Sequence, residues 1–152
     1  MKRTIHVRQR FIAYGFVCAV ALLTATPTVA QISEVSPATY DAALAERISN
    51  QLIASLDSPI AQIRQKALQH INFFATHHRD EIDLTGATPK LIEIYESDKQ
   101  EGFRILALAS LRAIGHESII RYLGENARMQ QSARVRELTF AALADYARAR
   151  TL

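Results

Sequence analysis

Residues 102–115 read GFRILALASLRAIG and contain the motif that decides the fold: an apolar residue, an arginine, then small and apolar residues at helical spacing. The same motif occurs as IRQKALQHI at residues 63–71 and as VRELTFAAL at residues 135–143. Its arginines, Arg64, Arg104 and Arg136, are separated by 40 and 32 residues. Repeats of this length are typical of stacked helical hairpins, so the sequence predicts a repetitive, all-α domain.

Six helices in three hairpins are expected over residues 37–150, and no stretch alternates apolar and polar residues as a strand would. Serine or threonine followed by proline marks three expected starts, at Ser36-Pro37, Ser58-Pro59 and Thr88-Pro89. We expect helices over residues 37–56, 59–76, 88–96, 99–114, 116–127 and 131–148. Gly115 is expected to end the fourth helix in the left-handed conformation.

The first two helices carry apolar stripes that are expected to face the core. In the first helix the stripe is Tyr40, Leu44, Ile48, Leu52 and Leu56. In the second it is Ile60, Ile63, Ala67, Ile71 and Phe74.

Residues 1–30 are expected to be a secretory signal peptide. They have a basic start, an uncharged run over residues 11–23, and the small residues Thr28-Val29-Ala30 before an expected cut at Gln31. An uncleaved anchor helix is the alternative, although this run of 13 residues is short beside the roughly 20 that span a bilayer. We therefore expect a periplasmic or secreted protein without a membrane span after cleavage, with residues 31–36 as a loose lead to the domain.

Removal of residues 1–30 would leave 122 residues with 14 Lys and Arg, 15 Asp and Glu, and no cysteine. The basic balance of the whole chain therefore comes from the signal, and no basic stripe remains that would favour nucleic-acid binding. Disulfides, a cysteine nucleophile and a cysteine-based zinc site are excluded in that mature chain.

The motif resembles the second helix of a HEAT or HEAT-like repeat, in which an Asp precedes the apolar-Arg pair by a few residues. Asp57 before Arg64 and Asp98 before Arg104 match this pattern, but no Asp stands at the corresponding place before Arg136. The resemblance covers residues 57–148 and implies a short right-handed αα-solenoid of about three hairpins. It also implies that Asp and Arg side chains form a ladder between neighbouring hairpins.

Catalytic and metal-binding residues are not predicted. The cluster HHRDEID at residues 77–83, His77-His78-Arg79-Asp80-Glu81-Ile82-Asp83, has residue types that bind metals. However, adjacent histidines point apart, and a metal site needs three or more converging ligands. No nucleophile elbow or glycine-rich phosphate loop occurs. We therefore expect neither a cofactor nor a metal, and no enzymatic activity.

Two functions remain as hypotheses. The first is an exported scaffold that binds a protein or peptide partner. The alternative, implied by the resemblance, is an enzyme or enzyme accessory similar to the HEAT-like lyases that attach tetrapyrroles to proteins. The expected export signal disfavours this alternative, and a chromophore or metal on the purified protein would distinguish the two.

A partner surface is predicted on the arc of the repeated helices that faces away from their paired helices. The candidate residues are Phe73, Ile105, Leu106, Ala109 and Leu138. If they are exposed, they would form an apolar patch edged by charge, as binding sites do. Alternatively, the middle helix is buried on more sides than its neighbours, and its apolar residues pack against them.

Overall fold

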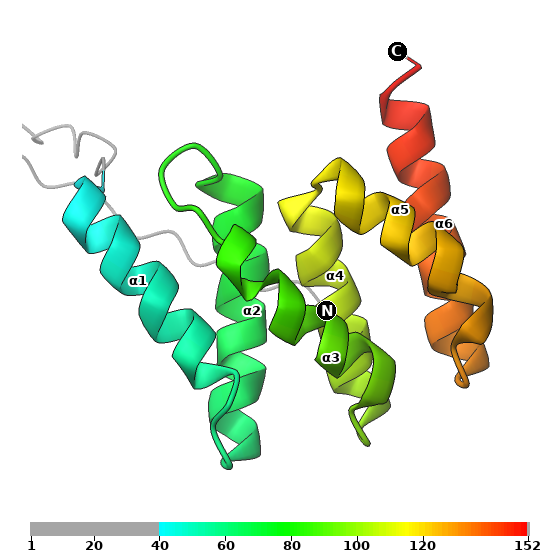
Figure 1. The fold of residues 1–152 in the computed structure, drawn as a ribbon, viewed down its shortest axis with the longest axis horizontal. Coiled ribbons are helices and arrows are strands. Elements are labelled where there is room, and N and C mark those ends of the chain that lie inside the picture. The colour runs from blue at the N-terminus through cyan, green and yellow to red at the C-terminus, as the bar shows by residue number, and fades with distance from the viewer. Residues whose placement is uncertain (1–39, 152) are drawn as a thin grey trace, which may run out of the picture. The chain divides into compact units, whose positions relative to one another are not determined.

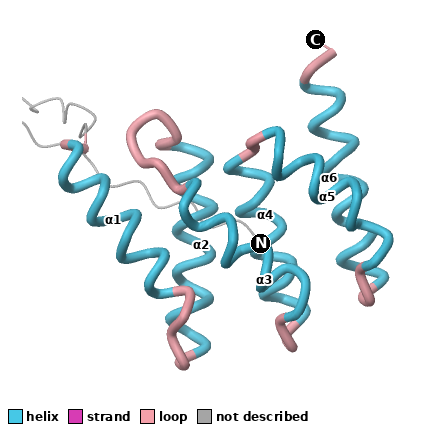
Figure 2. The backbone as a smooth tube through the Cα atoms, viewed as in Figure 1, coloured by secondary structure: helices cyan, strands magenta, loops and turns pink. Residues whose placement is uncertain are grey.

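The structure, a computed structural model, describes residues 40–151. The predicted signal peptide and loose lead lie outside this part of the chain. The described part is all-helical and has no strand, as predicted (Figures 1 and 2). Its elements in chain order are α1 (Ala42–Ser55), α2 (Ala61–His77), the 3-10 turn η1 (Thr85–Ala87), α3 (Thr88–Ser97), α4 (Glu101–Ile114), α5 (Glu117–Asn126), the 3-10 turn η2 (Ala127–Met129) and α6 (Ala133–Ala149).

The helices pair in chain order, α1 with α2, α3 with α4, and α5 with α6. We call these pairs hairpins 1, 2 and 3. The second helices carry the repeated motif and lie side by side, so that α4 packs against α2 on one side and against α6 on the other (Figure 1). α4 packs more extensively on α2 than on α6.

Two local signals in the sequence are confirmed. Thr88 and Pro89 stand in the first turn of α3, where proline needs no amide partner. Gly115 ends α4 in the left-handed conformation, with φ of 67°, and its N–H donates to the carbonyl of Leu111 at 3.0 Å.

Four predicted helix starts are wrong within the described residues. α4 begins at Glu101 instead of residue 99, and α6 begins at Ala133 instead of residue 131. The other two are the starts of α1 and α2. α1 begins at Ala42, because the Asp41 carboxylate caps it by accepting from the Leu44 N–H at 2.7 Å. α2 begins at Ala61 instead of Pro59, because Ser58 Oγ accepts from the Ile60 N–H and so holds the turn before the helix.

The predicted stripe of α2 is partly wrong. Ile60 and Ile63 are 52% and 42% exposed, whereas the helix buries Ala67, Leu68, Ile71 and Ala75. The buried face is turned toward α4, and no hairpin precedes hairpin 1 in the described residues to cover the other side. In α1 the buried residues are Ala45, Ser49 and Leu52, while Leu44 and Ile48 are half-buried.

The core is centred on α4, which buries residues along most of its length: Phe103, Ala107, Leu108, Ser110, Leu111 and Ile114. Ser110 is fully buried and donates its hydroxyl toward the carbonyl of Leu68 in α2, at 3.1 Å, and of Leu106 in its own helix, at 3.0 Å. The connection between hairpins 1 and 2 also contributes to the core through Ile82 and Leu84. Ser49 Oγ anchors this connection by donating to the carbonyl of Asp83 at 2.7 Å.

Candidate functional site

The predicted partner patch is exposed at its ends and half-buried in its middle. Phe73 of α2 is 51% exposed and Leu138 of α6 is 38% exposed. Ile105, Leu106 and Ala109 of α4 are half-buried, and Ile105 and Leu106 pack partly against the core. The α4 residues are therefore neither inaccessible nor freely exposed, and the patch stays a prediction.

Phe73 belongs to a cluster of aromatic and imidazole rings at the end of α2. Its ring centroid lies 5.4 Å from that of Phe74, 4.9 Å from that of His77 and 5.7 Å from that of His78. Tyr40 packs edge-on against both His78 and Phe74, at 5.3 and 6.1 Å. These contacts fix the ring of Phe74, while the exposed ring of Phe73 stands outside the core.

Two residues of the His77–Asp83 cluster, His78 and Glu81, bond to each other, and Glu81 also bonds to Tyr40. His78 Nδ1 lies 3.3 Å from Glu81 Oε1, and Glu81 Oε2 accepts from the Tyr40 N–H at 3.1 Å. The bond from Tyr40 and then that with His78 lower the pKa of the Glu81 carboxyl. Over residues 40–151, no three His, Cys, Asp or Glu side chains are grouped so that they could hold a metal ion.

An apolar groove runs between α1 and α2 on one side of hairpin 1. Its volume is about 360 Å³. α1 contributes Ile48, Gln51, Leu52 and Ser55, and α2 contributes Ile63, Lys66, Ala67, His70 and Phe74. Lys66 and His70 are the only ionisable residues among them. The sequence did not reveal the groove, because most of its apolar residues belong to the stripes of α1 and α2 that were expected to face the core.

The α2 residues of the groove have counterparts in α4 at the same positions of the motif. Ile63, Lys66, Ala67, His70 and Phe74 correspond to Phe103, Leu106, Ala107, Ser110 and Ile114. In α4 these positions face hairpin 1, since Ser110 donates to the Leu68 carbonyl of α2 and the guanidinium of Arg64 lies 5.1 Å above the Phe103 ring. The groove is therefore the side that hairpin 2 buries against the hairpin before it.

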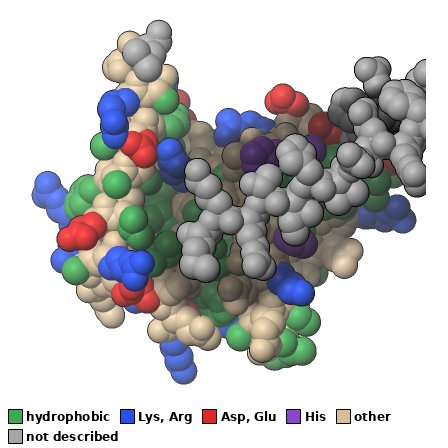
Figure 3. Space-filling view, turned by 180° about the vertical axis from the view of Figure 1, so that it is seen from behind, with side chains coloured by type: hydrophobic (Ala, Val, Ile, Leu, Met, Phe, Trp, Pro, Cys, Tyr) green, Lys and Arg blue, Asp and Glu red, His purple; other side chains and the backbone are tan. Residues whose placement is uncertain are grey.

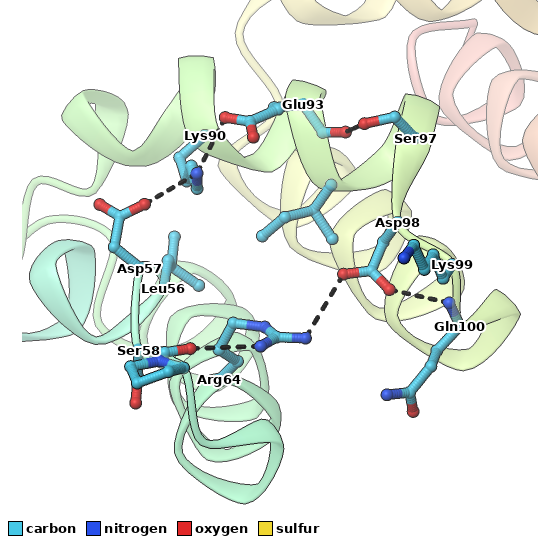
Figure 4. Close-up of a pocket in the computed structure, with 12 residues that line it drawn as sticks. Leu56, Asp57, Ser58, Arg64, Lys90, Glu93, Ser97, Asp98, Lys99 and Gln100 are labelled. Carbon is cyan, nitrogen blue, oxygen red and sulfur yellow. Dashed lines mark hydrogen bonds and ion pairs between the residues drawn. The ribbon is translucent and has the colours of Figure 1, made fainter.

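A polar pocket of about 480 Å³ lies where the turn of hairpin 1 meets the turn of hairpin 2 (Figure 4). Arg64 of α2 pairs with Asp98 at 3.7 Å and donates to the Ser58 carbonyl at 3.2 Å. Lys90 of α3 pairs with Asp57 at 2.7 Å, which links the two hairpins a second time.

Lys90 also pairs with Glu93 of its own helix, at 2.9 Å. Its bonds to Asp57, and then to Glu93, raise the pKa of the Lys90 ammonium. Because Arg64 and Lys90 are each matched by carboxylates, we interpret these residues of the pocket as a bridge between hairpins rather than as a site for an anionic ligand.

The corresponding bridge between hairpins 2 and 3 is incomplete. Gln130 stands six residues before Arg136, as Asp98 stands six before Arg104, so a neutral amide replaces the carboxylate. Among residues 40–151, Arg104 Nε and Gln130 Oε1 are the buried side-chain polar atoms that have no hydrogen-bond partner. In the repeated motif, Arg104 and Gln130 are the residues equivalent to Arg64 and Asp98, which form the bridge between hairpins 1 and 2.

Other bonds join hairpins 2 and 3 instead. The buried hydroxyl of Tyr95 lies 3.0 Å from that of Thr139, and burial raises the pKa of Tyr95. Ser132, the N-cap of α6, donates to Glu101 Oε2 at 2.7 Å. The hydroxyl of Tyr122 donates to Glu96.

Within residues 40–151 no helix has both the length and the apolar character needed to cross a bilayer. No family model, curated protein or solved structure matches the chain in comparisons with known proteins.

Proposed function

We propose that the protein is a short αα-solenoid of HEAT-like repeats that serves as a scaffold for a protein or peptide partner. The repeated motif supports this proposal, because its three copies lie on α2, α4 and α6, and α4 packs between the other two. The pair of Arg64 and Asp98 between hairpins 1 and 2 supports it as well, since this is the bond that the resemblance implies.

The observation that carries the binding role is where large apolar side chains are exposed. In the described residues they occur at the start and along the length of α2, in η2, and on α6: Ile60, Ile63, Phe73, Met129, Leu138 and Phe140. Hairpins 1 and 3 thus leave apolar side chains in water that hairpin 2 does not. Apolar side chains gathered between polar ones are typical of a surface that a partner covers.

Charged side chains accompany this apolar surface. On the edge that α6 forms, Figure 3 shows side chains of both signs between hydrophobic ones. Such an edge is typical of the polar rim around an interface.

We further propose that residues 1–30 are a cleaved signal peptide and that the domain acts in the periplasm or outside the cell. The intact mass of the protein from its native host should then correspond to a chain that begins at Gln31. Recovery of the full-length chain from the membrane fraction would show an anchor instead.

Partner capture tests the scaffold role. The tagged protein should be crosslinked in its native compartment, and the recovered proteins should be identified by mass spectrometry. We expect a partner that is recovered with the wild type and is lost on Phe73→Glu or Leu138→Glu. Ser118→Glu, at an exposed polar position of α5 that belongs to no part of the patch, is the matched control and should retain it. If no partner is enriched over the tag alone, the scaffold role is wrong.

A further inference from the structure

The groove between α1 and α2 has the lining pattern of a helix-binding site. On α1 the lining residues Ile48, Gln51, Leu52 and Ser55 are spaced i, i+3, i+4 and i+7. On α2 they extend from Ile63 to Phe74, which is about 17 Å at 1.5 Å per residue. Two antiparallel helices that present such rows to one groove offer the surface on which a third helix of about three turns packs.

A comparison of equivalent motif positions in α2 and α4 also indicates that a helix would fill the groove. In α4, which packs against α2, two of the residues equivalent to the α2 lining contact hairpin 1: Ser110 donates to the Leu68 carbonyl, and the Phe103 ring lies under the Arg64 guanidinium. Hairpin 1 has the same surface on α2, but no described residue of the chain supplies the helix that would cover it. The groove therefore has the form of an interface between hairpins from which one side is missing.

The charges in the groove select the character of that helix. Where α4 has Leu106 and Ser110, α2 has Lys66 and His70, and the groove lining contains no carboxylate. Lys66 is exposed, so its ammonium can reach an acidic side chain at the edge of a docked helix. A basic helix would place like charges together, which disfavours it.

From these observations we infer that the groove binds an amphipathic, acidic α-helix of a partner protein. The helix takes the place that the second helix of a preceding hairpin would have. This inference rests on the proposed scaffold function and adds to it a second contact site, the groove, and the class of partner.

Two synthetic helices of about 14 residues, constrained by a side-chain staple because short helices are marginal in water, test the inference. Both carry leucines spaced i, i+3, i+4, i+7 and i+11. One has glutamates beside this stripe, and the other has lysines in the same positions. We expect the acidic helix to bind the protein purified from its host at least about tenfold more tightly than the basic helix, as measured by fluorescence anisotropy.

Three variants locate the binding. Ile63→Glu places a carboxylate in the groove and should weaken the acidic helix by at least about tenfold. Ile60→Glu is the matched control, because Ile60 is similarly exposed at the start of α2 but does not line the groove. Lys66→Glu should reverse the preference, so that the basic helix binds more tightly. Circular dichroism melting should be nearly unchanged in all three, since all three side chains are exposed.

Other results would overturn the inference. They are equal binding of the two helices, or binding of the acidic helix that Ile63→Glu and Lys66→Glu leave unchanged. A wild-type dimer that Ile63→Glu dissociates in sedimentation would identify a second copy as the occupant. NMR shifts of residues before Tyr40 in the Lys66→Glu variant would identify the chain's own N-terminal segment.

The inference and the scaffold function fail separately. If a native partner is recovered equally with the wild type and Ile63→Glu, the scaffold function stands and the groove is not its site. If no partner is enriched from the native compartment, the scaffold function itself is wrong.

Discussion

The guanidinium of Arg64 in hairpin 1 lies 3.7 Å from the carboxylate of Asp98 in the turn of hairpin 2. The same guanidinium lies over the ring of Phe103, 5.1 Å from its centre. Both partners of the pair are largely shielded from water, with side chains 23% and 15% exposed. One side chain thus combines an ion pair and a cation–π contact across the boundary between two hairpins.

This pair should contribute measurably to the stability of the domain. Arg64→Ala should lower the free energy of unfolding by about 1–2 kcal/mol, because it removes both contacts and the bond to Ser58. Asp98→Ala also removes the carboxylate that accepts from the Gln100 N–H, so a double-mutant cycle is needed to isolate the pair. We expect a coupling of about 0.5–1 kcal/mol in urea denaturation. If the losses of the two single variants simply add, the two side chains do not interact directly. Arg121→Ala, at an exposed position, is the control and should change the free energy of unfolding by less than about 0.5 kcal/mol.

Completing the second bridge should stabilise the protein. Gln130→Glu supplies a carboxylate at the position that is equivalent to Asp98 and should raise the free energy of unfolding by about 0.5–1 kcal/mol at neutral pH. The gain depends on Arg104, whose Nε lacks a partner. In an Arg104→Gln background the same substitution would leave the buried carboxylate without Arg104, with only Arg136, which donates to the Gln130 carbonyl, nearby, and the gain should be lost. Equal effects in the two backgrounds, measured by thermal melting, would rule out pairing across this boundary.

Two glycines of α4 should respond to alanine in opposite directions. At Gly115, φ is 67° and an added Cβ would lie 3.2 Å from the carbonyl oxygen of Arg112, so Gly115→Ala should destabilise by about 1 kcal/mol or more. At Gly102 an added Cβ would meet no atom within 4 Å beyond its chain neighbours and the backbone of its own helix, and Gly102→Ala should stabilise by about 0.5–1 kcal/mol through helix propensity. Melting temperatures of the two variants check this, and a shift of the same sign in both would contradict it.

The bond that joins Glu81 to the start of the described chain should depend on pH. The pKa of Glu81 is lowered from its ordinary value of 4.5, chiefly by the N–H of Tyr40, so the ionised carboxylate favours the folded state. Its contribution is complete above 4.5 and is lost as pH falls through the lower pKa of the folded protein. The melting temperature of the wild type should exceed that of Glu81→Gln at about pH 7, and the gap should close toward about pH 3. A gap that widens on acidification would contradict this assignment.

Local chemistry made part of the fold predictable. Thr88-Pro89 and Gly115 act on their own backbone, so their roles do not depend on neighbours. Ile63 shows where such reasoning ends, because helical periodicity identifies an apolar face but not whether another hairpin covers it. Ile82 and Leu84 are buried from an irregular connection, where no periodicity exists to reveal them.

The predicted patch and the groove differ for a related reason. The predicted patch assumes that α2, α4 and α6 expose the same arc, but among these three helices only α4 has a motif helix on both sides. Comparing equivalent positions of the motif gives a signal that could have found the groove in the sequence. Lys66 and His70 stand where α4 has Leu106 and Ser110, and polar residues at such positions fit a repeat that no neighbour covers on that side within residues 40–151.

The ends of the stack also bear on whether copies of the chain can polymerise. A row of repeats whose last surface fits its first would add chain to chain and grow into a filament. Here the groove at one end has the ammonium of Lys66 and no carboxylate in its lining, and the surface of α6 at the other end carries Arg134 and Arg148 together with Glu137 and Asp145. Joining the two ends would strip these charges of water, and α6 offers no excess of carboxylates to the Lys66 ammonium in return, which opposes growth. The charges that suit the groove to an acidic helix therefore also discourage the protein from using another copy of itself in that role.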